Sequence, residues 1–465
     1  MPSENRLSIV GIGPGSRSLR TIGAEEAIKK ADFVVGYRPY LNMIGDLLHG
    51  KEIFSSGMGK EVDRAKAAVD LLAEGSVALV SSGDPNVYGM AGLGLEIAPQ
   101  PANVEVVPGV TSFAAAACRA GLVFQSSLAT ISLSDLLTPR PQIEQRLRLA
   151  SEYEMPIALY NPKSKKREQL LLRALELSKG REALVAKNVS RDDEEIFWTT
   201  TTKLMDDDAL RNKINMTTLI IISGRGLFRG DTSPEASVNL VGIGPGDKKH
   251  LTHEAQDLLK ISDKIFGAKR YLQSVADLTP AEKITHPGPC PERLTARYEE
   301  AKAAAQNGKR ASILAGGDPS IFGASWRILE RAAGECTVHI SPGVSAFSSV
   351  AAKAGAPLVN DFALLSNPSR NHAGQLAAAG FGVVIYNAEG HEIAPILQEI
   401  DPGRPCVLAR DVTRPGEESI ILRAGDLAKA GPSGFRFTLL ISAANSFIKD
   451  GKIITRRGYE SKYCY

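Results

Sequence analysis

Short apolar runs alternate along this chain with longer segments whose apolar residues recur at helical spacing. The runs are three or four residues long and rich in Val, Ile and Leu, which is typical of strands covered on both faces. The expected strands are Leu7–Val10, Val77–Val80, Val104–Val107, Ile157–Leu159 and Leu219–Ile222. The expected helices include Gly23–Ala31 and Lys60–Ala73. This alternation predicts an α/β protein with mostly parallel sheets.

The same pattern occurs twice. The block "VGIGPG" at Val10–Gly15 recurs 231 residues later, and the blocks "GDP" and "PGV" each recur after 234 residues. Six such blocks keep their order, so the chain is two tandem copies of one globular unit. We expect copy one at residues 1–232, a polar linker at 233–237 and copy two at 238–465. Each copy should have two lobes, which in copy one divide near residues 120–130.

Composition narrows the class of protein. The 55 Lys and Arg residues nearly balance the 52 Asp and Glu residues, which argues against a dedicated nucleic-acid binder. The five cysteines are scattered, without Cys-x-x-Cys spacing, and no His-Glu-x-x-His motif is present, so we predict no metal site. The N-terminal residues lack the pattern of a signal peptide, and no apolar run is long enough to span a bilayer. These features predict a soluble cytoplasmic protein.

The first glycine-rich loop is not a typical dinucleotide turn. Its glycines are spaced Gly11-x-Gly13-x-Gly15, and Pro14 supplies no backbone N–H. It is either a structural turn or a loop that lets an organic ligand approach the backbone closely. Asp84, in the second loop, is either a helix cap or a ligand contact. In the third loop, Thr111 or Ser112 is expected to cap the Ala-rich helix that follows.

Taken together, "VGIGPG", "SSGDP", "VPGVTS" and "ALYNP" resemble the tetrapyrrole methylases, over nearly the whole chain and once per copy. The resemblance implies two α/β lobes per copy with S-adenosylmethionine between them, and a methyltransferase of cobalamin biosynthesis. Copy one is most similar to the branch that methylates ring carbon 17 of precorrin-3B or cobalt-factor III with contraction of the ring. The blocks "VVGYRPYLNMI", "ISLSDLLTPR" and "IALYNPKSKKR" carry that similarity, and the chain's last block, "GKIITRRGYESKY", resembles the same branch.

The resemblance also implies the residues that contact the cofactor. In copy one these are Pro14, Ser82, Gly83, Asp84, Val87, Thr111, Ser112, Asn161 and Val189. In copy two they are Pro245, Gly316, Gly317, Asp318, Ile321, Ser345, Ala346, Asn387 and Val412.

The substrate implied is a tetrapyrrole that carries several carboxylates, so Arg and Lys side chains are expected to grip it. The candidates are Arg17, Arg20, Arg38, Arg140, Lys163, Lys166 and Arg167. Ring contraction also needs proton movement, for which the candidates are Asp135, Tyr160 and Ser134.

Each copy departs from the branch. The branch usually shows a His-Asp-Phe-like stretch after the third loop, where copy one reads "FQSSLATISLSD" and copy two keeps "VNDFALLS". Copy two has lost the "SDLLTP" block. Three alternatives follow. In the first, copy one is the catalytic copy. In the second, copy two is a non-catalytic module that binds the tetrapyrrole or serves in dimerisation, so that the chain is an internal pseudo-dimer or part of a homo-oligomer. In the third, both copies are active and methylate different ring carbons. The sequence leaves the methylated carbon and the presence of cobalt in the substrate open.

Overall fold

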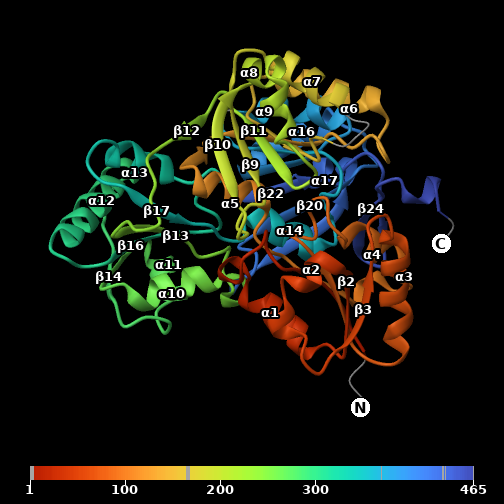
Figure 1. Cartoon of the computed structure of the whole chain (residues 1–465), viewed down its shortest axis with the longest axis horizontal. Helices are drawn as coiled ribbons and strands as arrows, with labels where there is room; N and C mark the ends of the chain where they lie inside the picture. The colour runs from red at the N-terminus through yellow and green to blue at the C-terminus, as the bar shows by residue number, and fades with distance from the viewer. Residues whose placement is uncertain (1–4, 164–167, 368, 432–433, 435, 464–465) are drawn as a thin grey trace.

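The computed structural model describes residues 5–163, 168–367, 369–431, 434 and 436–463. Within these residues the chain forms three large sheets (Figure 1). Two are five-stranded and belong to separate lobes, which we call N lobe one and N lobe two. The third is a ten-stranded sheet to which both copies contribute, and it lies between and above the two N lobes in Figure 1.

N lobe one contains a parallel sheet of strand order β3-β2-β4-β1-β5. Its strands are β1 (Leu7–Gly11), β2 (Phe33–Tyr37), β3 (Glu52–Ser56), β4 (Val77–Ser81) and β5 (Val104–Val107). Its helices are α1 (Ile22–Lys30), α2 (Arg38–Asn42), α3 (Glu61–Asp70) and α4 (Ala91–Ile97). All five residues of β1 and of β4 are buried, as their apolar sequences predict.

N lobe two repeats this arrangement in the order β15-β14-β16-β13-β17, also parallel. Its strands are β13 (Val238–Gly242), β14 (Lys264–Phe266), β15 (Glu282–Ile284), β16 (Ala311–Ala315) and β17 (Val338–Ser341). Its helices are α10 (His253–Ile261), α11 (Lys269–Ser274), α12 (Cys290–Gln306) and α13 (Ser325–Ala332). The carboxyl ends of the strands therefore meet at one edge in each N lobe, which is where open α/β sheets bind ligands.

The ten-stranded sheet joins the second lobes of the two copies, in the order β10-β9-β11-β8-β7-β18-β19-β22-β20-β21. Copy one contributes β7 (Ser127–Ser132), β8 (Ile157–Tyr160), β9 (Glu182–Lys187), β10 (Glu195–Thr200) and β11 (Thr218–Ile222). Copy two contributes β18 (Phe362–Leu365), β19 (Gly382–Ala388), β20 (Pro405–Arg410), β21 (Glu418–Arg423) and β22 (Phe437–Ile441). The copies meet where β7 and β18 run antiparallel.

The expectation of mostly parallel sheets is therefore wrong for this sheet. Parallel pairing is found for β7 with β8 and for β18 with β19, whereas the other pairs in the described part of the sheet are antiparallel. Only short connections link β9 to β10 and β20 to β21, and a short connection cannot carry the crossover that a parallel pair requires.

Helices cover both faces of the ten-stranded sheet. One face packs against α6 (Arg140–Glu152), α7 (Glu168–Leu177), α8 (Thr201–Asp206), α15 (Ala373–Ala378), α16 (Gly390–Gln398) and α17 (Ala424–Ala430), and the short α9 (Asp208–Asn212) follows α8. The other face packs against α5 (Ser112–Arg119) and α14 (Ala346–Ala354). These two helices consist largely of small residues, which lets them lie between the sheet and the two N lobes, and Phe113 stacks on Phe347 with ring centroids 6.3 Å apart.

Equivalent residues of the two copies meet in pairs, which marks an approximate twofold axis. Ala129 of β7 is opposite Ala363 of β18, and Phe113 stacks on its equivalent Phe347. Thr21 forms an antiparallel bridge with Thr252, and each caps the first turn of its own helix, α1 or α10. The copies are therefore arranged as a symmetric dimer within one chain.

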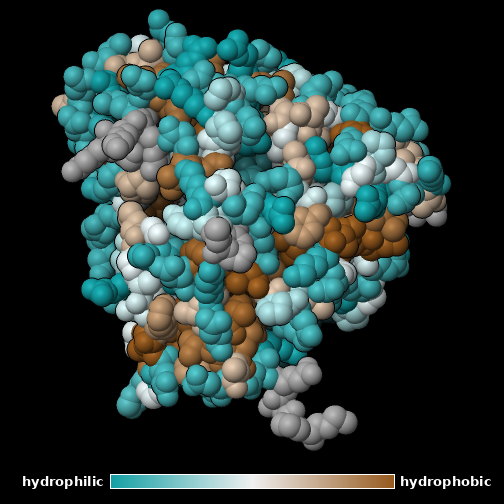
Figure 2. Space-filling view, turned by 90° about the vertical axis from the view of Figure 1, so that its right-hand side faces the viewer, coloured by the Kyte–Doolittle hydropathy of each residue, from teal (hydrophilic) through white to brown (hydrophobic). Residues whose placement is uncertain are grey.

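The end of each copy lies against the other copy. In copy one, β6 (Leu122–Phe124) pairs with β12 (Leu227–Arg229), and β12 contacts α13. In copy two, a hairpin of β23 (Ser446–Lys449) and β24 (Lys452–Thr455) contacts α4 of N lobe one. Beside it, Arg456 pairs with Glu96 at 3.0 Å. On the right-hand face of Figure 1, polar residues dominate and hydrophobic residues surface in patches between them (Figure 2).

We predict that Thr130→Val lowers the free energy of unfolding by about 1 kcal/mol. Thr130 is fully buried, and its hydroxyl donates a hydrogen bond of 2.9 Å to the Phe362 carbonyl across the junction of the copies. Valine keeps the shape but leaves this carbonyl without that donor. Urea unfolding of the full chain measures the loss, with Thr438→Val on the half-exposed face of β22 as control. An unfolding curve unchanged by Thr130→Val would contradict the prediction.

Candidate functional site

Three loops meet at the carboxyl edge of the sheet in N lobe one. They follow β1, β4 and β5, and the first two are joined by backbone hydrogen bonds of 2.8 and 3.2 Å between Gly13 and Gly83. Gly83 has a φ of +66°, and a Cβ built there would find no atom nearer than the Val110 carbonyl oxygen at 3.9 Å. The second loop therefore presents bare backbone to open space among the three loops.

Buried carboxylates hold the second loop in shape. Asp84 is 1% exposed, and its Oδ1 accepts hydrogen bonds from the backbone N–H of Asn86 at 2.7 Å and from the Asn86 side chain at 2.9 Å. In copy two, Asp318 accepts from the backbone N–H groups of Ser320 and Gly343, at 2.8 and 3.0 Å. Burial raises the pKa of Asp84 and of Asp318 to about 6, against the lowering effect of these hydrogen bonds. Each carboxylate is thus committed to hydrogen bonds that hold its loop in shape.

In copy one, the ten-stranded sheet places Tyr160 and Asn161 beside the start of α5. Tyr160 ends β8, and its hydroxyl lies 3.2 Å from the Ser112 hydroxyl and accepts from the Phe113 backbone N–H at 3.3 Å. Asn161 has a φ of +51° and donates its side-chain amide to the Ser132 hydroxyl at 3.0 Å. Burial raises the pKa of Tyr160 to about 12, so its phenol stays protonated at neutral pH. Three expected site residues, Ser112, Tyr160 and Asn161, are thus brought together.

Loops from the ten-stranded sheet close on the first loop of each copy. In copy one, the Ser16 and Ser190 hydroxyls are 2.6 Å apart, and Arg191 donates to the Pro14 carbonyl at 3.3 Å. Val189, next to this contact, is buried. In copy two, Arg414 donates to the Pro245 carbonyl and Val412 is buried. The first and last of the expected cofactor blocks therefore lie side by side in both copies.

The remaining expected cofactor residues also lie around these loops. Thr111, rather than Ser112, caps α5 by accepting the Ala114 backbone N–H at 3.4 Å. Ser82 is half-buried, whereas Val87 and its equivalent Ile321 are buried in the core beneath.

Copy two keeps the frame of the site with fewer polar groups. Gly317 has a φ of +75°, Asn387 a φ of +52°, and Tyr386 accepts from the Phe347 backbone N–H at 3.0 Å. Ser345 precedes α14 as Thr111 precedes α5, but it makes no side-chain capping hydrogen bond. Ala346 stands where copy one has Ser112, so the hydroxyl beside Tyr160 has no counterpart there.

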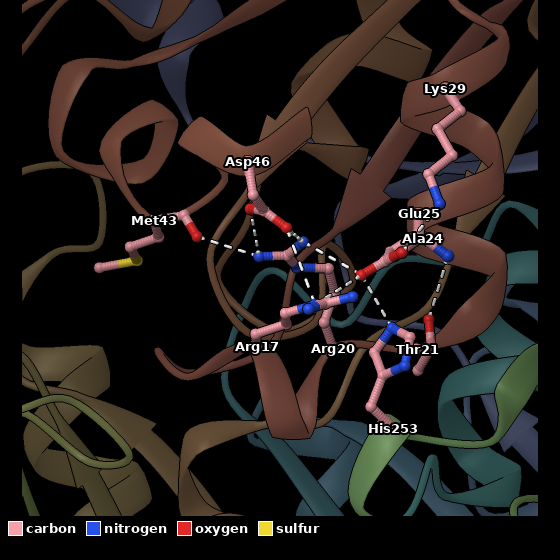
Figure 3. Close-up of polar contacts among 9 residues, drawn as sticks. All are labelled: Arg17, Arg20, Thr21, Ala24, Glu25, Lys29, Met43, Asp46 and His253. Atoms are coloured by element: carbon pink, nitrogen blue, oxygen red, sulfur yellow. Dashed lines mark hydrogen bonds and ion pairs between the residues drawn. The ribbon is translucent and has the colours of Figure 1, made fainter. Parts of the chain in front are cut away.

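Two of the expected substrate-binding arginines lie in an ion network at the junction of the copies (Figure 3). Arg20 is 1% exposed and donates to Asp46 at 3.0 Å, to Glu25 at 3.2 Å and to the Met43 carbonyl. His253 of N lobe two lies 2.8 Å from the same Glu25 carboxylate. This argues against Arg20 as a substrate contact. The side chain of Arg17 is 67% exposed and lies 3.5 Å from Glu25.

The other candidates for substrate binding and proton movement are spread over the surface. Arg38 is exposed at the start of α2, and Asp135 is exposed ahead of α6. Arg140 bonds Glu144 at 2.8 Å, and Lys163 bonds the Asn212 side chain at 3.0 Å. Lys166 and Arg167 lie outside the described residues. Arg140 and Lys163 thus have partners on α6 and α9.

Sequence reasoning missed a polar group beside Tyr160. The Tyr88 ring lies 4.9 Å from the Tyr160 ring, and its hydroxyl donates to Asp361 Oδ1 at 2.9 Å. The Ser132 backbone N–H donates to the same oxygen at 2.9 Å, and Arg146 pairs with Oδ2 at 2.9 Å. Two differences between the copies could have indicated this polar group. Tyr88 in "DPNVYGM" stands where copy two has Phe322, and Asp361 in "VNDF" of copy two has no equivalent Asp in copy one.

The described ranges of the chain contain neither a metal-binding cluster nor a membrane-spanning helix. No group of three or more His, Cys, Asp or Glu residues is placed to hold a metal ion there. In the same ranges, no helix is long and apolar enough to cross a membrane.

The chain belongs to the family described as Tetrapyrrole (Corrin/Porphyrin) Methylases, whose model matches residues 6–205 and again 237–428. The two matches agree with the repeated blocks and with the paired lobes. The fold and the site thus define a methylase unit present twice in one chain.

The relatives come from cobalamin biosynthesis. The chain is 40% identical over 234 residues to a probable cobalt-factor III C(17)-methyltransferase of Salmonella typhimurium, which covers 48% of this chain and 95% of that protein. It is 41% identical to the cobalamin biosynthesis protein CbiHC of Archaeoglobus fulgidus, over 38% of this chain and 40% of that protein. It is 43% identical to a precorrin-3B C(17)-methyltransferase of a Sinorhizobium species, over 37% of this chain and 70% of that one.

Among solved structures, the chain is similar to the methyltransferase CobJ, with 33% identity and a TM-score of 0.43. The match covers 48% of this chain and 95% of that one.

We predict that Asp318→Asn makes the slope of stability against pH more positive between about pH 4 and 6. The folded-state pKa of Asp318 is about 6 and the reference value is 3.8, so in this window the folded chain holds a proton that the unfolded chain has lost. This group therefore makes stability fall as pH rises, and its removal takes away up to about 1.4 kcal/mol per pH unit of that fall.

Urea unfolding at a series of pH values tests this prediction. Asp257→Asn, whose carboxylate on α10 is 73% exposed, serves as the control that keeps the slope. Equal slopes for Asp318→Asn and the unsubstituted chain would refute the raised pKa.

Proposed function

We propose that this chain is an S-adenosylmethionine-dependent C-methyltransferase of cobalamin biosynthesis that acts on cobalt-factor III or precorrin-3B with ring contraction. The observation that carries this proposal is the site of copy one, where the Tyr160 hydroxyl lies 3.2 Å from the Ser112 hydroxyl, Asn161 follows Tyr160, and the start of α5 lies next to Gly83. The identity of 40% to a protein named for that reaction gives the substrate class.

The loops of copy one fit S-adenosylmethionine. Around Gly83 the backbone leaves room for a ligand to approach without meeting a side chain, and the half-buried Ser82 flanks it. The N-terminus of α5 lies next to Gly83, since the Ser112 backbone nitrogen is 4.0 Å from a Cβ built there. Backbone N–H groups at a helix start favour a carboxylate, which the amino-acid part of this cofactor carries.

The work left to the protein is positioning. When bound, S-adenosylmethionine supplies a methyl group already activated on a sulfonium, so the methyl–sulfur bond breaks as the bond to the ring carbon forms. Holding donor and acceptor in line can be worth roughly 7–11 kcal/mol of the barrier. Tyr160, protonated at neutral pH and held by Ser112 and the Phe113 backbone, can orient an acceptor group but is not poised as a base.

The substrate's carboxylates need positively charged side chains near this site. Arg17 and Arg38 are exposed on N lobe one, and Arg140 and Lys163 lie on the sheet side. We propose these four, with Arg167 beyond the described residues, as the substrate contacts. The exposed Asp135 remains a candidate for proton movement together with Tyr160.

A second candidate role concerns copy two as a non-catalytic partner. The copies share one sheet through β7 and β18, and copy two lacks the hydroxyls that Ser112 and Tyr88 supply in copy one. Copy two then maintains a pseudo-dimer in which copy one carries out methyl transfer. A methylase of another ring carbon remains the alternative, because "QSSLAT" departs from the branch.

We predict that Asp84→Ala weakens S-adenosylmethionine binding at least about tenfold, because loss of the carboxylate frees the loop that presents Gly83. Titration calorimetry of the full chain measures the dissociation constant. Asp84→Asn keeps one acceptor for the Asn86 N–H, so its dissociation constant should lie between those of the unsubstituted chain and Asp84→Ala. Unchanged affinity in Asp84→Ala would remove Asp84 from the site.

The activity itself is tested by incubating the full chain with methyl-labelled S-adenosylmethionine and either precorrin-3B or cobalt-factor III. One added labelled methyl group in the product mass, located at carbon 17 by carbon-13 NMR, is the expected result. Incorporation at another carbon would select the alternative, and no incorporation into either substrate would refute the proposed function.

A further inference from the structure

One carboxylate of copy two lies beside the residues that contact Tyr160 and Asn161 of copy one. Asp361 precedes β18, the strand that pairs with β7 at the twofold axis, and this pairing places it beside the carboxyl end of β7. Its side chain is 5% exposed. A carboxylate this deeply buried is costly to desolvate, so it is kept only where hydrogen-bonding partners hold it.

The partners of Asp361 come from copy one. Oδ1 accepts the Tyr88 hydroxyl and the Ser132 backbone N–H, both at 2.9 Å, and Oδ2 pairs with Arg146 at 2.9 Å. Ser132 in turn accepts from Asn161. The bonds to Tyr88 and Ser132 reach residues in contact with Tyr160 and Asn161, whereas the bond to Arg146 points toward the interior of the sheet's helical layer.

The twofold-related position holds none of this chemistry. The equivalent of Asp361 is Ser127, and the equivalent of Tyr88 is Phe322, whose ring lies 5.3 Å from that of Tyr386. The backbone is nonetheless the same, since Tyr88 and Phe322 have φ values of +52° and +49°. The carboxylate and the phenol that binds it therefore occur together on the copy-one side, and both are absent at the equivalent positions, Ser127 and Phe322.

Copy two contributes a cation to the same place. Arg457, which follows the β23–β24 hairpin, has its guanidinium 5.1 Å from the centre of the Tyr88 ring and donates to the Val359 carbonyl at 2.5 Å. Tyr88 is thus held between a carboxylate and a guanidinium that both belong to copy two. A phenol that donates a hydrogen bond to a carboxylate becomes a better acceptor for a donor on the substrate.

We propose that Asp361 of copy two is a positioning residue for the site of copy one: it fixes the Tyr88 hydroxyl beside Tyr160, and the chain has a single site for methyl transfer, built from both copies. The inference rests on the proposed function and deepens it. Copy two is then required for turnover at the site of copy one, whereas the equivalent place in copy two catalyses no methyl transfer. The Tyr88 hydroxyl oxygen then accepts a hydrogen bond from a donor group of the tetrapyrrole.

The test uses Asp361→Ala, Asp361→Asn and Tyr88→Phe in the full chain. We expect Asp361→Ala to lower kcat about 100-fold, as a displaced positioning group does, with the KM for S-adenosylmethionine within about twofold. Asp361→Asn keeps an oxygen that can accept the Tyr88 hydroxyl and should recover part of kcat. Added to Tyr88→Phe, Asp361→Ala should lower kcat little further, because both changes remove the same interaction.

Controls separate positioning from stability. Arg146→Met removes the interior partner of Asp361 and should lower the Tm while leaving more of kcat than Asp361→Ala does, at a temperature below both transitions. Ser127→Ala, at the twofold-related position, should leave kcat unchanged. Additive losses in the double variant, or a kcat for Asp361→Ala equal to that of the unsubstituted chain, would overturn the inference while the function stands. If the unsubstituted chain transfers no methyl group to either substrate, the proposed function itself fails.

Discussion

The antiparallel pairing of β7 with β18 is the contact on which the rest of the molecule depends. It turns two half-sheets into one, so that neither copy leaves an exposed edge at its centre. Ala129 and Ala363, opposite each other at the axis, belong to the core on the side of α6 and α15, whereas Leu128 and Leu364 belong to the core that includes α5 and α14. The position of each N lobe, and hence of each set of glycine loops, follows from this register, since a slip by one residue would exchange the side chains that face the two helical layers.

The repetition and the local elements could be predicted from sequence because they rest on local signals. Apolar runs predicted β1, β4 and β5 with ends correct to within a residue, and the Thr21 and Thr111 caps begin helices where capping residues should. The antiparallel pairs of the ten-stranded sheet could not be predicted, because pairing is set by contacts far apart in sequence. The register of β7 on β18 leaves no mark in either strand alone.

The candidate site was predictable in part for the same reason. Glycine spacing located the loops, and family motifs located Ser112 and Asn161. What a motif cannot show is which groups a side chain will meet. Asp84, expected at the ligand, is buried against Asn86, and Arg20, expected at the substrate, is committed to Asp46 and Glu25. Asp361 escaped notice because its partners lie more than 200 residues away in the chain.

The segment between β12 and β13 has a consequence beyond joining the copies. It makes their association intramolecular, so the effective concentration of each half toward the other is fixed by a short tether and does not fall on dilution. It also fixes the stoichiometry of two unlike halves at one to one. A dimer of identical subunits must carry every change twice, whereas here each half is free to specialise, and a deficiency in one can persist as long as the other compensates for it.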